Sequence, residues 1–229
     1  MVDPIKIVQA LVGAELTAQK GGRYIPAGNV VTVSRMYGCG GEEVAEQLAK
    51  RLNVEYFDKQ ILEAIVAAAP ENKALMERLD RQMTSVREEV MHMIVTGHSA
   101  TEQYRRHLMN VILGIARNSG VIVGRGAHLL LSSYHAYRVR IVASEDICAA
   151  RVAESQKLSP REAMRWVRQA DHEHSDFIRH VFHRDINDPT SYDLIVNTDH
   201  TGLDQATEIV LFAMQQCGYQ LPKGALRVG

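Results

Sequence analysis

The sequence predicts an α/β fold in which a five-stranded parallel sheet is sandwiched by helices. Short apolar, β-branched runs alternate with stretches whose apolar residues recur at helical spacing. Parallel strands require crossover connections, which are usually helices, and a sheet covered on both faces produces such continuous apolar strands. The 229 residues, 46% of them hydrophobic, suffice for one domain with a sizeable core.

The predicted strands are short runs, most of them rich in valine and isoleucine. The five runs are residues 29–34, 54–57, 120–124, 139–143 and 193–197. Between the first two, Val44, Leu48 and Leu52 recur at i, i+4 and i+8, which predicts one buried helix face.

The remaining helices are predicted from end signals and periodicity. Ser159-Pro160 marks the start of a charged helix over 159–181, Ser144 caps the helix before it, and a closing helix spans 203–217. Residues 127–131 read as a short helix, Asp58 is a well-placed N-cap, and two or three helices are expected within 72–118. We therefore expect a helical extension over 1–28, a core domain over 29–218 and a tail over 219–229 that is loose from Pro222.

Composition excludes several function classes. The net charge of −1 gives no global field that would recruit a nucleic acid polymer or an anionic membrane. No apolar run approaches the ~20 residues of a membrane span, and charges interrupt the first thirty residues, so no signal peptide is expected. Cys39, Cys148 and Cys217 are too far apart for a disulfide framework or a cysteine zinc site, which favours the cytoplasm.

The first candidate site is the glycine cluster after the first strand. Gly38, Cys39, Gly40 and Gly41 precede a helix, so their N–H groups form either a phosphate nest or merely a tight turn. Aligned on its glycines with the phosphate-binding consensus G-x-x-x-x-G-K-[ST], the loop has Gly41 in place of lysine. Arg35 is the candidate for the missing positive charge. Two acidic residues open the helix: Glu43 is a candidate Mg²⁺ ligand, although both Glu42 and Glu43 also suit the helix dipole.

Two further candidate sites are rich in arginine, which supplies 19 of the 26 basic residues. Arg125 stands between Gly124 and Gly126 after the third strand, where it either reaches an anion or pairs with a neighbouring acid. The segment from Arg161 to Arg184 holds five arginines and no lysine. Arginines that close over phosphates are a common device of phosphoryl transfer, and a salt-bridged helix surface is the alternative.

Taken in order, these segments resemble the cytidylate kinase-like family, a branch of the P-loop nucleoside monophosphate kinases. The motifs that carry the resemblance, over roughly residues 29–217, are Val31-Thr32-Val33-Ser34-Arg35, Tyr37-Gly38-Cys39-Gly40-Gly41, Tyr56-Phe57-Asp58-Lys59, Val121-Ile122-Val123-Gly124-Arg125-Gly126, and Asp188-Pro189 with Tyr192-Asp193-Leu194-Ile195-Val196-Asn197-Thr198. The resemblance implies helical monophosphate-binding and lid segments beside the sheet. It also implies ATP with Mg²⁺ as donor and CMP or dCMP as acceptor.

The resemblance implies roles for individual residues. Gly38, Cys39, Gly40 and Gly41 would wrap the donor phosphates. Asp58 and Arg125 would position the acceptor. Residues 161–184 would form the lid, whose Arg168, Arg179 and Arg184 are the candidate catalytic residues together with Arg35.

Several positions depart from the pattern of the family. The lysine is absent, Met36 stands where an acid is frequent, Glu42 where a basic residue is frequent, and Cys39 replaces a serine. In the lid Asp171 is kept, but His174 replaces a common arginine and Phe177 a common tyrosine. One charge-stabilising group is often worth ~10³ in rate.

These departures leave a second hypothesis open: a catalytically weak or inactive nucleotide-binding sensor or scaffold on the same fold, with a homodimer formed through residues 72–118. A kinase for another small phosphate acceptor is a third. The histidines between His172 and His183 fit a solvated helix better than a metal site, because His172 and His174 point to different faces. Cys39 fits a small residue of the loop better than a reactive thiol.

Overall fold

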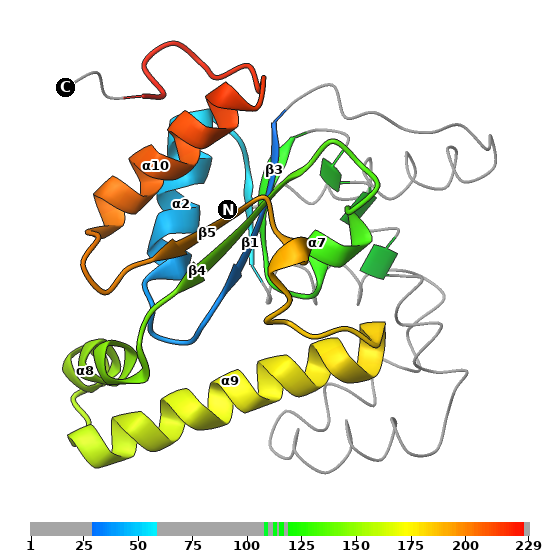
Figure 1. Cartoon of the computed structure of the whole chain (residues 1–229). Coiled ribbons are helices and arrows are strands. Elements are labelled where there is room, and N and C mark those ends of the chain that lie inside the picture. The colour runs from blue at the N-terminus through cyan, green and yellow to red at the C-terminus, as the bar shows by residue number, and fades with distance from the viewer. Residues whose placement is uncertain (1–28, 59–107, 110–111, 114, 117–118, 227–229) are drawn as a thin grey trace. The chain divides into compact units, whose positions relative to one another are not determined.

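The computed structural model describes residues 29–58, 108–109, 112–113, 115–116 and 119–226. The chain divides into two compact units, one formed by residues 1–23 and 58–115 and the other by residues 24–57 and 116–229. The second unit contains the sheet (Figure 1). The predicted extension over 1–28, and most of the predicted helical segment 72–118 with its proposed dimer surface, lie outside the described residues.

The sheet has five parallel strands in the spatial order β2-β3-β1-β4-β5, which confirms the predicted fold class. The strands are β1 (Val30–Arg35), β2 (Tyr56–Phe57), β3 (Gly120–Val123), β4 (Tyr137–Val142) and β5 (Leu194–Asn197). The first strand is central: Val33 is paired with Val123 of β3 on one side and with Val139 of β4 on the other. The loops after β1, β3 and β4 therefore meet at one edge, where parallel α/β sheets bind ligands.

Helices cover both faces of the sheet. They are α2 (Gly41–Leu52), α7 (Ala127–Leu130), α8 (Glu145–Gln156), α9 (Pro160–Phe182) and α10 (Leu203–Gln216), with the 3₁₀ turn η2 (Pro189–Ser191) before β5. Figure 1 shows α2 and α10 side by side on one face and α7 on the other, while α9 runs past the carboxyl ends of the strands. No helix within the described ranges is long and apolar enough to cross a membrane.

The two faces of the sheet differ in chemistry because alternate residues of a strand point to opposite sides. Val31, Val33 and Ile141 join the apolar core with the predicted stripe of α2, Val44, Leu48 and Leu52. The alternate positions Thr32, Ser34 and Arg140 are buried and polar. One face is thus a conventional hydrophobic core, and the other buries hydrogen-bonding groups.

A local sequence signal predicts the start of α9 correctly, whereas the C-terminal segment differs from its prediction. The Ser159 hydroxyl accepts a hydrogen bond from the backbone N–H of Glu162, whose carboxylate accepts one from the backbone N–H of Ser159 at 3.1 Å. This capping box starts α9 where the sequence predicts it. The segment expected to be loose from Pro222 instead contacts the core, since Ala225 is buried and Leu221 and Leu226 pack against it. Burial of these apolar side chains explains the difference.

Candidate functional site

The glycine loop, residues 36–40, joins β1 to α2 and is held from several sides. Gly38 and Gly40 have φ values of +80° and +81°, which side chains rarely adopt. A Cβ atom on Gly38 would lie 2.8 Å from the carbonyl oxygen of Cys148. The carbonyl of Cys39 accepts hydrogen bonds from Thr198 Oγ1 at 2.7 Å and Arg151 Nη1 at 2.9 Å. The loop is therefore fixed in shape before any ligand arrives.

Arg35 and Gly41 show how the loop is built without the lysine of the phosphate-binding consensus. A Cβ atom on Gly41 would lie 2.5 Å from Cβ and 3.0 Å from Cγ of Arg35, so the arginine side chain fills the space beside this position. In the consensus G-x-x-x-x-G-K the first glycine falls on Arg35 and the lysine on Gly41. The glycine and the cation have exchanged positions, and a cation remains beside the loop.

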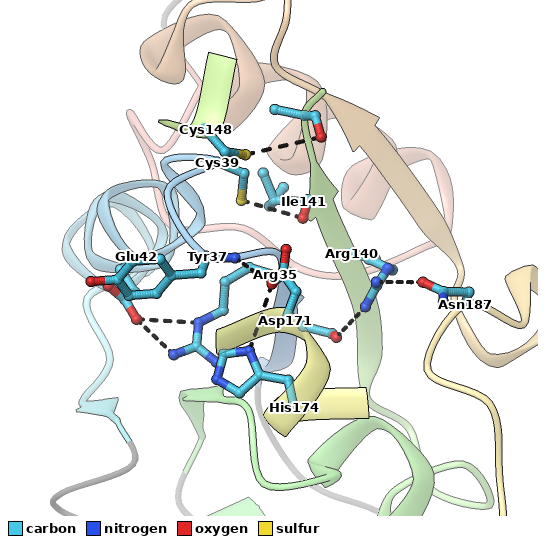
Figure 2. Close-up of polar contacts among 12 residues, drawn as sticks. Arg35, Tyr37, Cys39, Glu42, Arg140, Ile141, Cys148, Asp171, His174 and Asn187 are labelled. Carbon is cyan, nitrogen blue, oxygen red and sulfur yellow. Dashed lines mark hydrogen bonds and ion pairs between the residues drawn. The ribbon is translucent and has the colours of Figure 1, made fainter. Parts of the chain in front are cut away.

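The guanidinium of Arg35 is engaged by the first turn of α2. It donates hydrogen bonds from Nε and Nη2 to Oε1 of Glu42, at 3.2 Å and 2.6 Å. Figure 2 shows the two side chains facing each other. The Arg35 side chain is 14% exposed, whereas that of Glu42 is 54% exposed. The pair neutralises the charge of Arg35, but its acidic partner faces solvent and can exchange for another anion.

The turn Gly124-Arg125-Gly126 lies next to this cation. Its three residues all have positive φ values of 73°, 52° and 69°, so the chain makes a left-handed turn. A Cβ atom on Gly126 would lie 2.2 Å from the ring of Phe182. The Arg125 guanidinium lies 5.0 Å from the centroid of the Phe177 ring. Burial, followed by the nearby charge of Arg35, lowers the pKa of Arg125 to about 10, so two cations face one region.

α9 contacts the glycine loop through Asp171, whose Oδ1 accepts a hydrogen bond from the backbone N–H of Tyr37 at 2.8 Å. Nδ1 of His174 lies 4.0 Å from the same oxygen (Figure 2). The candidate lid arginines lie elsewhere in this conformation. Arg168 donates to Glu145 at 2.9 Å, Arg179 pairs with Asp176 at 3.2 Å, and Arg184 is exposed.

A buried polar cluster that sequence reasoning missed lies behind the loop: Ser34, His128, Arg140 and Tyr192, with the exposed Asn187 at its rim. Arg140 is 5% exposed and donates to Ser34 Oγ at 3.0 Å and to Asn187 Oδ1 at 2.9 Å. Its Nη1 also lies 3.4 Å from the Tyr192 hydroxyl. The only available sequence signal was an arginine inside an apolar strand, at a position that faces away from the apolar core.

A family model described as the cytidylate kinase-like family matches residues 30–200, which include the glycine loop, the Gly-Arg-Gly turn and α9. The chain belongs to the cytidylate kinase-like family. This confirms the resemblance carried by the sequence motifs, and with it a kinase-like fold. Comparison with curated protein sequences finds no match.

Comparison with solved structures also finds matches to this member of the cytidylate kinase-like family. An uncharacterized protein from Eubacterium ventriosum is 19% identical with a TM-score of 0.66, and the match covers 82% of this chain and 98% of that one. A shikimate kinase from Bacteroides thetaiotaomicron is 16% identical with a TM-score of 0.45, covering 83% and 98%. A gluconokinase from Sinorhizobium meliloti is 15% identical with a TM-score of 0.45, covering 85% and 95%. At 19% identity, the likeness to the first of these bears on the fold alone.

The structure brings some of the predicted family residues together and leaves others apart. Arg35 lies beside the glycine loop and is close enough to Arg125 to lower its pKa. Glu43 is exposed at the start of α2, and Asp58 is half-buried directly after β2. Within the described ranges, no three histidine, cysteine or acidic side chains form a metal-binding group, so the metal alternative for the α9 histidines gains no support.

Cys39 has the character of a packing residue of this loop. It is fully buried, and its thiol lies 3.3 Å from the carbonyl oxygen of Ile141, to which it donates a hydrogen bond. Burial raises the pKa of Cys39 to about 12, although nearby backbone groups act in the opposite direction. The thiol therefore stays protonated at neutral pH, which disfavours the redox alternative.

Proposed function

We propose that this member of the cytidylate kinase-like family transfers a phosphoryl group from ATP–Mg²⁺ to a nucleoside monophosphate, CMP or dCMP. The exchange of positions between Arg35 and Gly41 carries the proposal. A loop with only a structural role would not need a cation beside it, yet Gly41 leaves room for the stem of Arg35. Phosphoryl transfer depends mainly on positioning and charge neutralisation, which a relocated cation can supply.

The proposed roles carry the family resemblance over to the residues of this chain. The backbone N–H groups of the glycine loop and the first turn of α2 hold the donor phosphates, with Arg35 beside them. Arg125 and Asp58 position the acceptor. Arg168, Arg179 and Arg184 neutralise charge after α9 moves, which requires Arg168 to leave Glu145 and Arg179 to leave Asp176. Such exposed pairs are worth about 0–1 kcal/mol, so their exchange costs little.

The residues present fit ATP and Mg²⁺. Gly38 and Gly40 form the kind of tight backbone cradle that accepts phosphate oxygens. In kinases Mg²⁺ needs only one or two protein carboxylates because phosphates and water complete its shell, and Glu43 at the start of α2 is the proposed ligand. The metal would neutralise phosphate charge when bound.

The decisive experiment measures phosphoryl transfer from labelled ATP–Mg²⁺ across a panel of nucleoside monophosphates, with binding of each nucleotide recorded on the same samples. We expect turnover of one pyrimidine monophosphate. Arg125→Ala should lower kcat/KM for that acceptor by ~10² or more while ATP binding changes little. Arg161→Ala, an exposed change on α9, is the matched control. An equal loss of acceptor use and ATP binding would refute the role given to Arg125.

A second candidate function is nucleotide binding without transfer, as a sensor or scaffold. The Arg35–Glu42 pair favours it, because the cation beside the loop is already neutralised. Saturable nucleotide binding with no transfer to any acceptor would support this reading. Transfer to a phosphorylated acceptor outside the nucleotide panel would instead identify a kinase for a different small molecule.

A further inference from the structure

A carboxylate of α9 reaches into the glycine loop. Oδ1 of Asp171 accepts the hydrogen of the Tyr37 backbone N–H at 2.8 Å, across 134 positions of sequence. Tyr37 belongs to the loop whose N–H groups are the proposed donors to phosphate. Figure 2 shows Asp171 extending from α9 to the loop beside Arg35. One hydrogen-bond donor of the proposed phosphate site is therefore already used by an anion of the chain itself.

Asp171 lies close enough to two arginines to be affected by their charges. Burial is the strongest influence on its carboxyl and raises its pKa, as does the charge of Glu145, whereas the Tyr37 N–H and the charges of Arg140 and Arg35 act to lower it. Within the part of the chain that the structure describes, no carboxylate lies within ion-pair distance of Arg140, whose hydrogen-bond partners are neutral. The carboxylate of Asp171 thus supplies negative charge close to Arg140 and Arg35.

A phosphate bound in the glycine loop would use the Tyr37 N–H and the charges of the nearby arginines, as Asp171 does. The hydrogen of a backbone N–H lies on one line, so the Tyr37 N–H cannot serve the Asp171 carboxylate and a phosphate oxygen at full strength together. A polyphosphate beside the carboxylate would also be repelled by it. The two anions therefore compete for one position.

We propose that Asp171 is an internal competitor: its carboxylate occupies the phosphate position of the glycine loop in the free protein, and donor phosphates displace it together with α9. The contact lowers the apparent affinity for phosphates by holding a fraction of the molecules in a state that cannot bind them. It also couples donor binding to movement of the helix that carries the lid arginines. This inference rests on the proposed function, because it takes the glycine loop as a phosphate site.

The test measures binding of pyrophosphate and of ATP by calorimetry to the full chain and to two variants. Asp171→Ala removes the acceptor and its charge, and we expect both ligands to bind roughly tenfold more tightly, as for the loss of one competing charged hydrogen bond. Asp171→Asn keeps an acceptor oxygen but not the charge, so its gain should be smaller. Glu173→Gln, the same loss of charge at an exposed position of α9, should leave affinity unchanged.

Trp166 provides a second measurement in the unaltered protein. It is the only tryptophan, lies on α9 and is 56% exposed, so its fluorescence reports on this helix. Pyrophosphate should change the emission of the wild-type chain, whereas Asp171→Ala should begin near the ligand-bound value and change little. This readout needs no catalytic turnover.

The outcomes separate the two proposals. Binding to the wild-type chain with equal or weaker binding to Asp171→Ala, in a variant that unfolds at the same urea concentration, would overturn the inference and leave the proposed function standing. An unchanged Trp166 emission on saturation of the wild-type chain would also overturn it. Absence of binding by every form of the protein would refute the phosphate site itself, and the inference would fall with it.

Discussion

His128 of α7 is a neutral histidine in the buried polar cluster. Its ring stacks on Tyr192 with centroids 4.8 Å apart, and its Nε2 lies 3.3 Å from the Tyr192 hydroxyl. Burial, then the charges of Arg140 and Arg138, lower the pKa of His128 to about 3. The folded state therefore keeps this ring neutral at pH values where the unfolded chain protonates it.

The first prediction is that acid destabilises the protein through His128. Because the folded pKa lies below the ordinary value of 6.5, stability is unaffected above about pH 6.5 and falls as the pH decreases toward about 3. The loss between pH 7 and pH 5 should be roughly 2 kcal/mol from this residue. His128→Gln, which cannot be protonated, should remove most of that loss in urea unfolding experiments.

His200→Gln, at an exposed position, is the control and should retain the loss of stability between pH 7 and pH 5. A stability difference between wild type and His128→Gln that stays constant with pH would contradict the assignment.

At the scale of residues, the sequence predicts best where function depends on a local motif. Arg35, Gly41 and Arg125 were identifiable because glycines and arginines after strands form compact signals. The members of the buried polar cluster were not. Arg140 lies 106 positions from Ser34 and 47 from Asn187 along the chain, and no local pattern links them. The contact of Asp171 with Tyr37, across 134 positions, was hidden for the same reason.

The glycine loop and the first turn of α2 act as one element, and the second prediction concerns the exchanged positions within it. Gly41→Lys restores the lysine of the consensus but places its Cβ atom 2.5 Å from Cβ of Arg35. We expect this change to lower the free energy of unfolding by about 1–3 kcal/mol through overpacking, with no gain of ATP affinity. Chemical unfolding and ATP titration measure the two effects.

The double variant Arg35→Gly with Gly41→Lys removes the collision and recreates the consensus order. It should recover at least half of the ATP affinity that Arg35→Gly alone loses. Glu46→Lys, a new lysine at an exposed position of the same helix, is the control for added charge. Equal affinity of the single and double variants would show that the cation is not exchangeable between the two positions.

At the scale of elements, periodicity and end signals predicted the five strands and the helices from α2 to α10 that the structure describes. The capping box at Ser159 and the stripe of α2 formed as expected. β4 begins at Tyr137, two residues before the predicted start, because Arg138 continues the ladder although it is charged. The strand order could not be predicted, because it depends on contacts between segments far apart in the chain.

At the scale of the whole molecule, near-zero net charge conceals an uneven distribution. The chain has 26 basic and 27 acidic residues, yet Arg35, Arg125 and Arg140 gather near the carboxyl ends of β1, β3 and β4. Many of the balancing acids lie on the surface, as in the exposed pairs of Arg168 and Arg179. Composition alone cannot reveal that three arginines gather at one edge of the sheet.

Arg140 connects several elements at this edge of the sheet, and the last prediction concerns its removal. Its guanidinium ties β1 through Ser34 to β4 and to the segment before β5 through Asn187 and Tyr192. Arg140→Ala removes a buried guanidinium that bonds the Ser34 hydroxyl and Asn187, so the free energy of unfolding should fall by about 2–4 kcal/mol. Arg168→Ala, which removes a pair whose arginine side chain is 64% exposed, should cost about 0–1 kcal/mol.

Urea unfolding followed by both circular dichroism and Trp166 fluorescence checks this prediction, since a loss shared by the sheet and α9 should appear in both signals. A loss seen only by fluorescence would confine the effect of Arg140 to α9 and the segment after it, and equal costs for the two variants would mean that the buried cluster contributes no more than a surface pair.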